Sequence, residues 1–212
     1  MRMWFGAVVL VFGLWASSAS AQVSSYRGLP PLENIVRQFQ AMALVVDAAG
    51  EQRVFPRWSG PVRVGFRGSD FGKRKEITRA MADVARLTGL GIELAERDET
   101  ANLAIWLQGA GCRTEFQRGY VIVGVGLRTL RHCLLQHLVH AVGPRLDACH
   151  ARPSLFCPSD DPFDEFQPVD RIIITAAFDP RLKNGMSEAE VMPIARVVLG
   201  ELVARWEKGE RW

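Results

Sequence analysis

The segment from His132 to Gly143, HCLLQHLVHAVG, constrains the fold most, because it is patterned as a helix with two different faces. At about 100° per residue, one arc collects the aliphatic side chains Leu134, Leu135, Leu138, Val139 and Val142. The three histidines and Gln136 fall on the other arc. Gly143 and Pro144 end the pattern, as a glycine and a following proline commonly end a helix. We therefore expect a helix that packs against a core on one side and presents imidazoles on the other.

The spacing of Gln136, His137 and His140 overlays the His-Glu-x-x-His pattern of zinc peptidases, but only the last position matches. In that pattern two histidines bind zinc, and the glutamate takes a proton from the metal-bound water. Here an amide occupies the first ligand position and His137 occupies the position of the base, so conventional zinc hydrolysis is not expected. Two interpretations stay open. One is an unconventional metal site in which His140 combines with His137, Asp147 or His150. The other is a polar helix face whose imidazoles hydrogen-bond to neighbouring loops and sheet.

We take six residues as the candidate site face. They lie on the helix and in the loop that follows it, and comprise His132, Gln136, His137, His140, Asp147 and His150.

The first 21 residues have the pattern of a cleaved signal peptide. Arg2 precedes an apolar run from Trp4 to Trp15, and Ala19-Ser20-Ala21 is a small-residue cleavage signal. The run is shorter than the roughly 20 residues that span a bilayer. We expect an exported protein, periplasmic or secreted, with a linker at 22–31 and one domain at 32–212. We expect no membrane-spanning segment in the mature chain.

The charge balance is nearly neutral, with 26 Lys and Arg against 23 Asp and Glu. A nucleic-acid partner would favour a strongly basic chain, so none is expected. A protein or peptide ligand of the cell envelope is compatible with this balance. The sequence carries no signal for the oligomeric state.

Four cysteines, Cys112, Cys133, Cys149 and Cys157, predict two disulfides in an exported chain. Three pairings are possible. We favour Cys112–Cys133, which would tie a strand end to the histidine helix, and Cys149–Cys157, which would close a short loop after it. A zinc–thiolate site is the competing interpretation. The chain has no Cys-x-x-Cys and its expected compartment is oxidising, which disfavours that site.

Hydrophobic periodicity predicts an α+β fold, with a mixed sheet of about five strands packed against helices and a C-terminal helical segment. Ser187 and Glu190 form a capping box at the start of the last helix. The tail from Trp206 to Trp212 is expected to fray. The expected helices cover residues 32–46, 73–87, 130–142, 170–178 and 187–206. The expected strands cover residues 53–58, 62–66, 91–95, 102–107 and 120–125.

Several segments together resemble the bacterial domain-of-unknown-function family 2927, which is found in exported and lipid-anchored proteins. The resemblance covers roughly Leu32 to Val203, and its most specific part is DPRLKNGMS, Asp179 to Ser187. It implies a zincin-like α+β fold without an established activity. The other segments that carry it are PRWSGPVRVGFRG, LTGLGIEL, ANLAIWL, the Cys133 helix and PSLF.

The chain departs from this family on the histidine helix. The family helix usually reads C-x-x-E-E-x-x-Q-x-x-G-L, whereas Gln136 and His137 stand at the two acids and His140 at the glutamine. No catalytic residue is therefore implied by the resemblance. We expect a non-catalytic, zincin-like binding or structural protein of the envelope, without a cofactor. The alternative is a metal-dependent hydrolase, with zinc as the candidate metal, that uses unconventional ligands on the 132–150 segment.

Two charged clusters complete the candidates. An acidic cluster at 159–165 offers oxygen ligands of the kind that calcium prefers, with a solvated loop as the simpler interpretation. A basic cluster would suit an anionic ligand, or be a solvated sheet edge; it comprises Arg57, Arg63, Arg67, Lys73, Arg74 and Lys75.

Overall fold

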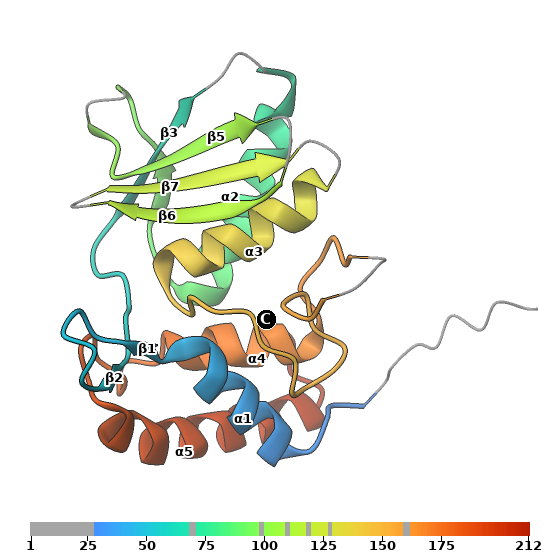
Figure 1. Ribbon diagram of the computed structural model, residues 1–212. Coiled ribbons are helices and arrows are strands. Elements are labelled where there is room, and N and C mark those ends of the chain that lie inside the picture. The colour runs from blue at the N-terminus through green and yellow to red at the C-terminus, as the bar shows by residue number, and fades with distance from the viewer. Residues whose placement is uncertain are drawn as a thin grey trace, which may run out of the picture.

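The structure is a computed structural model of the 212-residue chain. It describes residues 28–67, 71–97, 100–108, 111–117, 120–126, 129–158 and 162–212. The expected signal peptide, most of the linker, and residues 159–161 of the acidic cluster lie outside the described residues. The α+β class is confirmed: a five-stranded mixed sheet packs against helices, as Figure 1 shows.

The sheet has the strand order β4-β3-β5-β7-β6. The first four strands are parallel and β6 is antiparallel to β7 at the edge. On β3, β5 and β7 the buried side chains Val64, Ile105 and Val123 belong to one sheet face, because alternate residues of a strand point the same way. The strands are β3 (Val62–Arg67), β4 (Ile92–Leu94), β5 (Leu103–Gln108), β6 (Arg113–Gln117) and β7 (Tyr120–Gly126).

Two helices, α2 (Arg74–Thr88) and α3 (Leu130–Val142), cover one face of this sheet (Figure 1). The helix α3 packs against β6, β7 and α2 through the aliphatic arc foreseen from its sequence, and Leu134, Leu135 and Leu138 are fully buried. The sheet, α2 and α3 form the sheet half of the molecule.

The helical half lies below the sheet half in Figure 1 and is built from both ends of the described chain. It contains α1 (Leu32–Ala43), α4 (Pro168–Ala177), α5 (Glu188–Glu207), and the short antiparallel pair β1 (Val45–Val46) and β2 (Arg53–Val54). The apolar helix α4 packs against α1, α2 and α5. The buried residues of both halves form one continuous hydrophobic core.

Residues 55–58, here called the crossing segment, connect the two halves. Phe55 N donates to Met186 O and Gly185 N donates to Phe55 O, both at 2.9 Å. Trp58 N donates to Val142 O at the end of α3, at 2.8 Å. The strand predicted over 53–58 is therefore wrong beyond residue 54, because these backbone groups bond to distant loops and a helix end.

Other boundaries also differ from the sequence expectations. The first helix ends at Ala43 rather than residue 46, since Val45 and Val46 pair with β2. The edge strand β6 was not predicted. The capping box before α5 is confirmed, as Ser187 N donates to Glu190 Oε2 at 2.8 Å.

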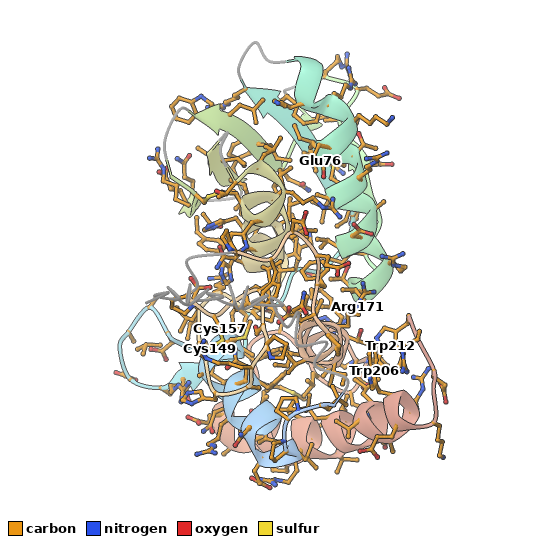
Figure 2. All side chains as sticks on the ribbon, turned by 90° about the vertical axis from the view of Figure 1, so that its right-hand side faces the viewer. Glu76, Cys149, Cys157, Arg171, Trp206 and Trp212 are labelled. Carbon is orange, nitrogen blue, oxygen red and sulfur yellow. A yellow bond between two sulfur atoms is a disulfide. The ribbon has the colours of Figure 1, made fainter. Side chains whose placement is uncertain are left out.

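The tail after α5, which was expected to fray, contacts α4 in the structure. Trp212 Nε1 donates to Thr175 Oγ1 at 3.0 Å, and Arg171 Nη1 donates to Trp212 O at 2.9 Å. Figure 2 shows Arg171, Trp206 and Trp212 together beside α4. The tail is thus fixed by side-chain contacts that its charged sequence does not reveal. In the part of the chain that the structure describes, no helix is long and apolar enough to span a membrane.

Candidate functional site

His140 lies at the centre of the predicted site face and is 4% exposed. Its Nδ1 is 2.7 Å from Pro144 O, and its Nε2 is 3.0 Å from Asp147 Oδ1. Both ring nitrogens thus lie within hydrogen-bond distance of oxygen atoms of the following loop. Through these two contacts His140 closes the turn after α3.

Asp147 joins a second helix residue to this pair. Its Oδ1 also accepts from Gln136 Nε2 at 2.8 Å, while the side chain is 52% exposed. Burial acts to raise the pKa of Asp147, but the hydrogen bonds from His140 and Gln136 outweigh it and lower the pKa below its ordinary value. Three of the six predicted site residues thus form one hydrogen-bonded unit.

His137 contacts the sheet. Its Nδ1 is 2.9 Å from Thr114 Oγ1 on β6, and its ring centroid is 5.5 Å from that of His140. Burial and the charge of His140 lower the pKa of His137 to about 4, so its imidazole is neutral at neutral pH. Thr114 was not predicted as part of the site. Thr114 and Phe116 are two residues apart, the spacing of one strand face, and this spacing was the available signal for β6.

The two remaining histidines lie apart from this unit. His132 Nδ1 is 2.9 Å from Phe163 O, at the other end of α3. His150 is exposed, and its backbone N donates to Gln38 Oε1 at 2.5 Å. The structure thus brings Gln136, His137, His140 and Asp147 together and leaves the other two histidines outside.

The donor set does not fit a metal centre. Within the described ranges, no group of three or more His, Cys, Asp or Glu side chains is arranged to hold a metal ion. Both nitrogens of His140 are engaged by oxygen atoms of its own chain, Pro144 O and Asp147 Oδ1. The arrangement fits a hydrogen-bonded turn better than metal ligation.

The cysteines lie in the two pairs favoured from the sequence. Cys112 and Cys133 join the approach to β6 with α3, at a Cα–Cα distance of 5.6 Å. Cys149 and Cys157 close the loop after α3, at 4.8 Å, and are labelled in Figure 2. Both distances fall within the usual disulfide range of about 4.4–6.8 Å. We call residues 149–157 the disulfide loop.

The disulfide loop is anchored by two buried polar side chains. On one side, Gln38 Oε1 of α1 accepts from His150 N and Ala151 N, while its Nε2 donates to Ala148 O. Gln38 was not predicted as a functional residue from the sequence. Its position inside the apolar stripe of α1, between Ile35 and Phe39, was the available signal.

Asp170 of α4 is the second anchor and has no exposed surface. Ser154 Oγ donates to its Oδ1 at 2.6 Å, and Leu155 N and Gln167 N each donate to its Oδ2 at 2.9 Å. Burial raises the pKa of Asp170 to about 6, and the three hydrogen bonds act in the opposite direction.

A separate groove of about 470 Å³ lies where the two halves meet. The crossing segment, the ends of β6 and β7, the end of α3 and the loop before α5 all contribute to it. Its lining residues are Arg57, Trp58, Ser59, Asn102, Phe116, Gln117, Tyr120, Val121, Ala141, Arg145 and Asn184. Arg57 belonged to the predicted basic cluster, whereas Arg145 was missed because its loop is placed only by tertiary contacts.

Arg57 is held firmly in this groove. Its Nη1 donates to Asp179 O and Leu182 O, each at 2.8 Å, and its guanidinium carbon is 5.2 Å from the centroid of the Phe178 ring. Its backbone N donates to Asn184 Oδ1 at 2.9 Å. Asp179, Leu182 and Asn184 all belong to the segment Asp179–Ser187, the part of the sequence on which the family resemblance is most specific.

Comparison with family models matches residues 108–197 to the family described as Protein of unknown function (DUF2927). Over these residues the match supports the family resemblance predicted from the sequence. It spans β6, β7, α3, both disulfides and α4, together with the part of the groove from Phe116 to Asn184. A search among curated proteins found no match.

Proposed function

With residues 108–197 assigned to DUF2927, a family of unknown function, we propose that this chain is a non-catalytic binding domain of the cell envelope. The observation that carries the proposal is the state of His140. A general base or metal ligand must direct a free lone pair at its target, whereas both nitrogens of His140 are engaged by Pro144 and Asp147.

The other imidazoles of α3 support the same conclusion. His132 is bonded to Phe163 O, and His137 is bonded to Thr114 Oγ1. Each histidine of this helix thus has a partner from its own chain, and these contacts join the helix to a loop and to the edge strand. We assign the histidine face a structural role, and we assign binding to the groove at the junction of the two halves.

The two cysteine pairs support export. Disulfides persist in oxidising compartments such as the periplasm and the extracellular space. Together with the signal peptide expected at residues 1–21, they favour a periplasmic or secreted protein. We also retain the zincin-like relationship implied by the family resemblance as part of the proposal, with α3 in the position of the helix that would carry the zinc motif.

The test is metal content after expression with the expected leader into an oxidising periplasm. We expect elemental analysis to find no stoichiometric zinc, and EDTA to leave the melting temperature unchanged. His140→Ala should lower the melting temperature, because Pro144 O loses its partner and Asp147 keeps only Gln136. Stoichiometric zinc that is lost in His140→Ala but retained in His132→Ala would instead establish the metal-dependent alternative.

A further inference from the structure

We propose that the groove between the two halves binds an oxyanion, the carboxylate or phosphate of a small ligand, through Arg57 and Arg145. This inference rests on the proposed binding function and adds the chemical class of the ligand. It is independent of the histidine face, which shares no residue with the groove.

The charge of the lining is the first argument. Among the described residues that line the groove there are two arginines and no acidic side chain. Another groove of the molecule combines Arg63 with Glu93 and Glu96, so its carboxylates outnumber its one arginine among the described lining residues. In the groove between the halves, by contrast, the described lining offers an entering anion two arginines and no carboxylate, although Asp179 acts on Arg57 from outside the lining.

Arg57 and Arg145 also differ from other arginines in their pairing. Arg131 forms ion pairs with Glu76 and Asp83 of α2, and Arg181 forms ion pairs with Asp179 and Glu201. Among the residues that the structure describes, neither Arg57 nor Arg145 forms an ion pair with a side chain.

The guanidinium of Arg57 is already oriented. Two backbone carbonyls hold Nη1, which leaves Nε and Nη2 without a hydrogen-bond partner among the described residues. Burial lowers the pKa of Arg57, and Asp179 only partly offsets this. A bound anion would stabilise the charged form and would not have to order the side chain first.

Arg145 supplies the second cation from the loop after α3. Its backbone N donates to Met42 O at 3.0 Å, which fixes its position in the chain. Its guanidinium carbon lies 4.0 Å from the centroid of the Phe116 ring, within cation–π distance. Stacking on this ring leaves the planar edge of the guanidinium available for hydrogen bonds to an oxyanion.

The remaining lining suits a ligand whose oxyanion is attached to a flat or apolar body. Trp58 and Tyr120 contribute aromatic surface, and Gln117 and Asn184 contribute amides. Pockets that bind small molecules combine apolar walls with a few placed polar groups in this way.

We would test the proposal by titrating the full mature chain with inorganic phosphate and, separately, with benzoate, following the indole N–H of Trp58 by NMR. We expect a saturable shift at Trp58 with at least one of the two probes. A tighter response to phosphate would identify phosphate as the ligand group, and a tighter response to benzoate would identify a carboxylate. Arg145→Gln should weaken binding at least fivefold, because it removes an exposed cation without disturbing the core.

The matched control is Arg79→Gln, which removes one exposed positive charge from α2, outside the groove. Its affinity should stay within twofold of the parent. If Arg79→Gln and Arg145→Gln weakened probe binding equally, the effect would come from the overall charge of the protein, and the proposal would be overturned. The lack of a saturable response to either probe would also overturn it. Neither result bears on metal content, so failure of the oxyanion site is distinguishable from failure of the proposed non-catalytic function.

Discussion

Asp170 of α4 and Ser154 of the disulfide loop are joined by a hydrogen bond of 2.6 Å that is wholly buried. The same carboxylate accepts from the backbone at Leu155 and at Gln167. One side chain thus caps the start of α4 and also fastens the disulfide loop to the helical half.

Replacing Asp170 with alanine should therefore destabilise the fold. The change leaves the buried donors Ser154 Oγ and Leu155 N and the half-buried Gln167 N without this acceptor, and each buried donor left unpaired costs roughly 1–3 kcal/mol. We expect a loss of about 3 kcal/mol in the free energy of unfolding, measured by urea denaturation. Ser154→Ala should lose less, about 1–2 kcal/mol, because Leu155 N and Gln167 N keep Asp170 as their acceptor and only Phe156 N loses its own. A matched change at the exposed Glu207 should have little effect, and an equally small effect of Asp170→Ala would contradict this account.

Asp170 should also affect the pH dependence of stability. Its pKa is raised from 3.8 to about 6 in the folded state, so the folded chain holds this proton more tightly than the unfolded chain between those values. The contribution of Asp170 to the free energy of unfolding therefore falls as pH rises from 3.8 to about 6. Asp170→Asn should remove this fall. Unfolding curves of the parent and the variant at pH 4, 5, 6 and 7 provide the check, and parallel profiles would show that Asp170 does not titrate in this range.

His137 should change the pH dependence of stability in the opposite direction to Asp170. Its pKa is lowered from 6.5 to about 4, so the unfolded chain takes up this proton between those values and the folded chain does not. Stability from His137 is therefore present above pH 6.5 and is lost as pH falls towards 4. The groups that set this shift are His140, Asp147 and His132, besides burial. His137→Gln should flatten the acid side of the profile, whereas His150→Gln, at an exposed position, should leave its shape unchanged.

The two cysteine pairs should contribute separately to stability. By the chain-entropy estimate, removing Cys112–Cys133 with a double alanine change costs about 3 kcal/mol, and removing Cys149–Cys157 costs about 2.5 kcal/mol. Peptide mapping without reduction should recover the same two pairs. A peptide that links Cys133 to Cys149 would show that the connectivity is wrong.

Gln38 provides a test of the first anchor of the disulfide loop. Gln38→Leu keeps a side chain of similar size on α1 but removes the partner of Ala148 O, His150 N and Ala151 N. We expect a loss of about 2–3 kcal/mol and faster amide hydrogen exchange at residues 150 and 151. Gln52→Leu, at an exposed position, is the matched control. Unchanged exchange in Gln38→Leu would show that the disulfide alone orders this loop.

Secondary structure was predicted best where the hydrophobic periodicity and the residues that end a helix agreed. The histidine helix was placed at residues 130–142, as observed, because its aliphatic periodicity runs directly into Gly143 and Pro144. The crossing segment was misassigned because Phe55 and Trp58 bond to residues more than 80 positions away, which a local pattern cannot reveal. Arg145 was missed for the same reason, since its place in the groove depends on contacts with α1 and β6.

The helical half packs the first helix of the described chain against the last, so it can assemble only after α5 has been synthesised. Glu33 of α1 is paired with Arg196 of α5, and Gln40 of α1 bonds to Glu188 at the start of α5. The first helix of the described chain therefore lacks its partner until nearly the whole polypeptide has emerged from the ribosome or crossed a membrane. During that interval its apolar residues Ile35, Phe39 and Met42 stay uncovered. Such a delay between synthesis and burial favours association with a chaperone along the way.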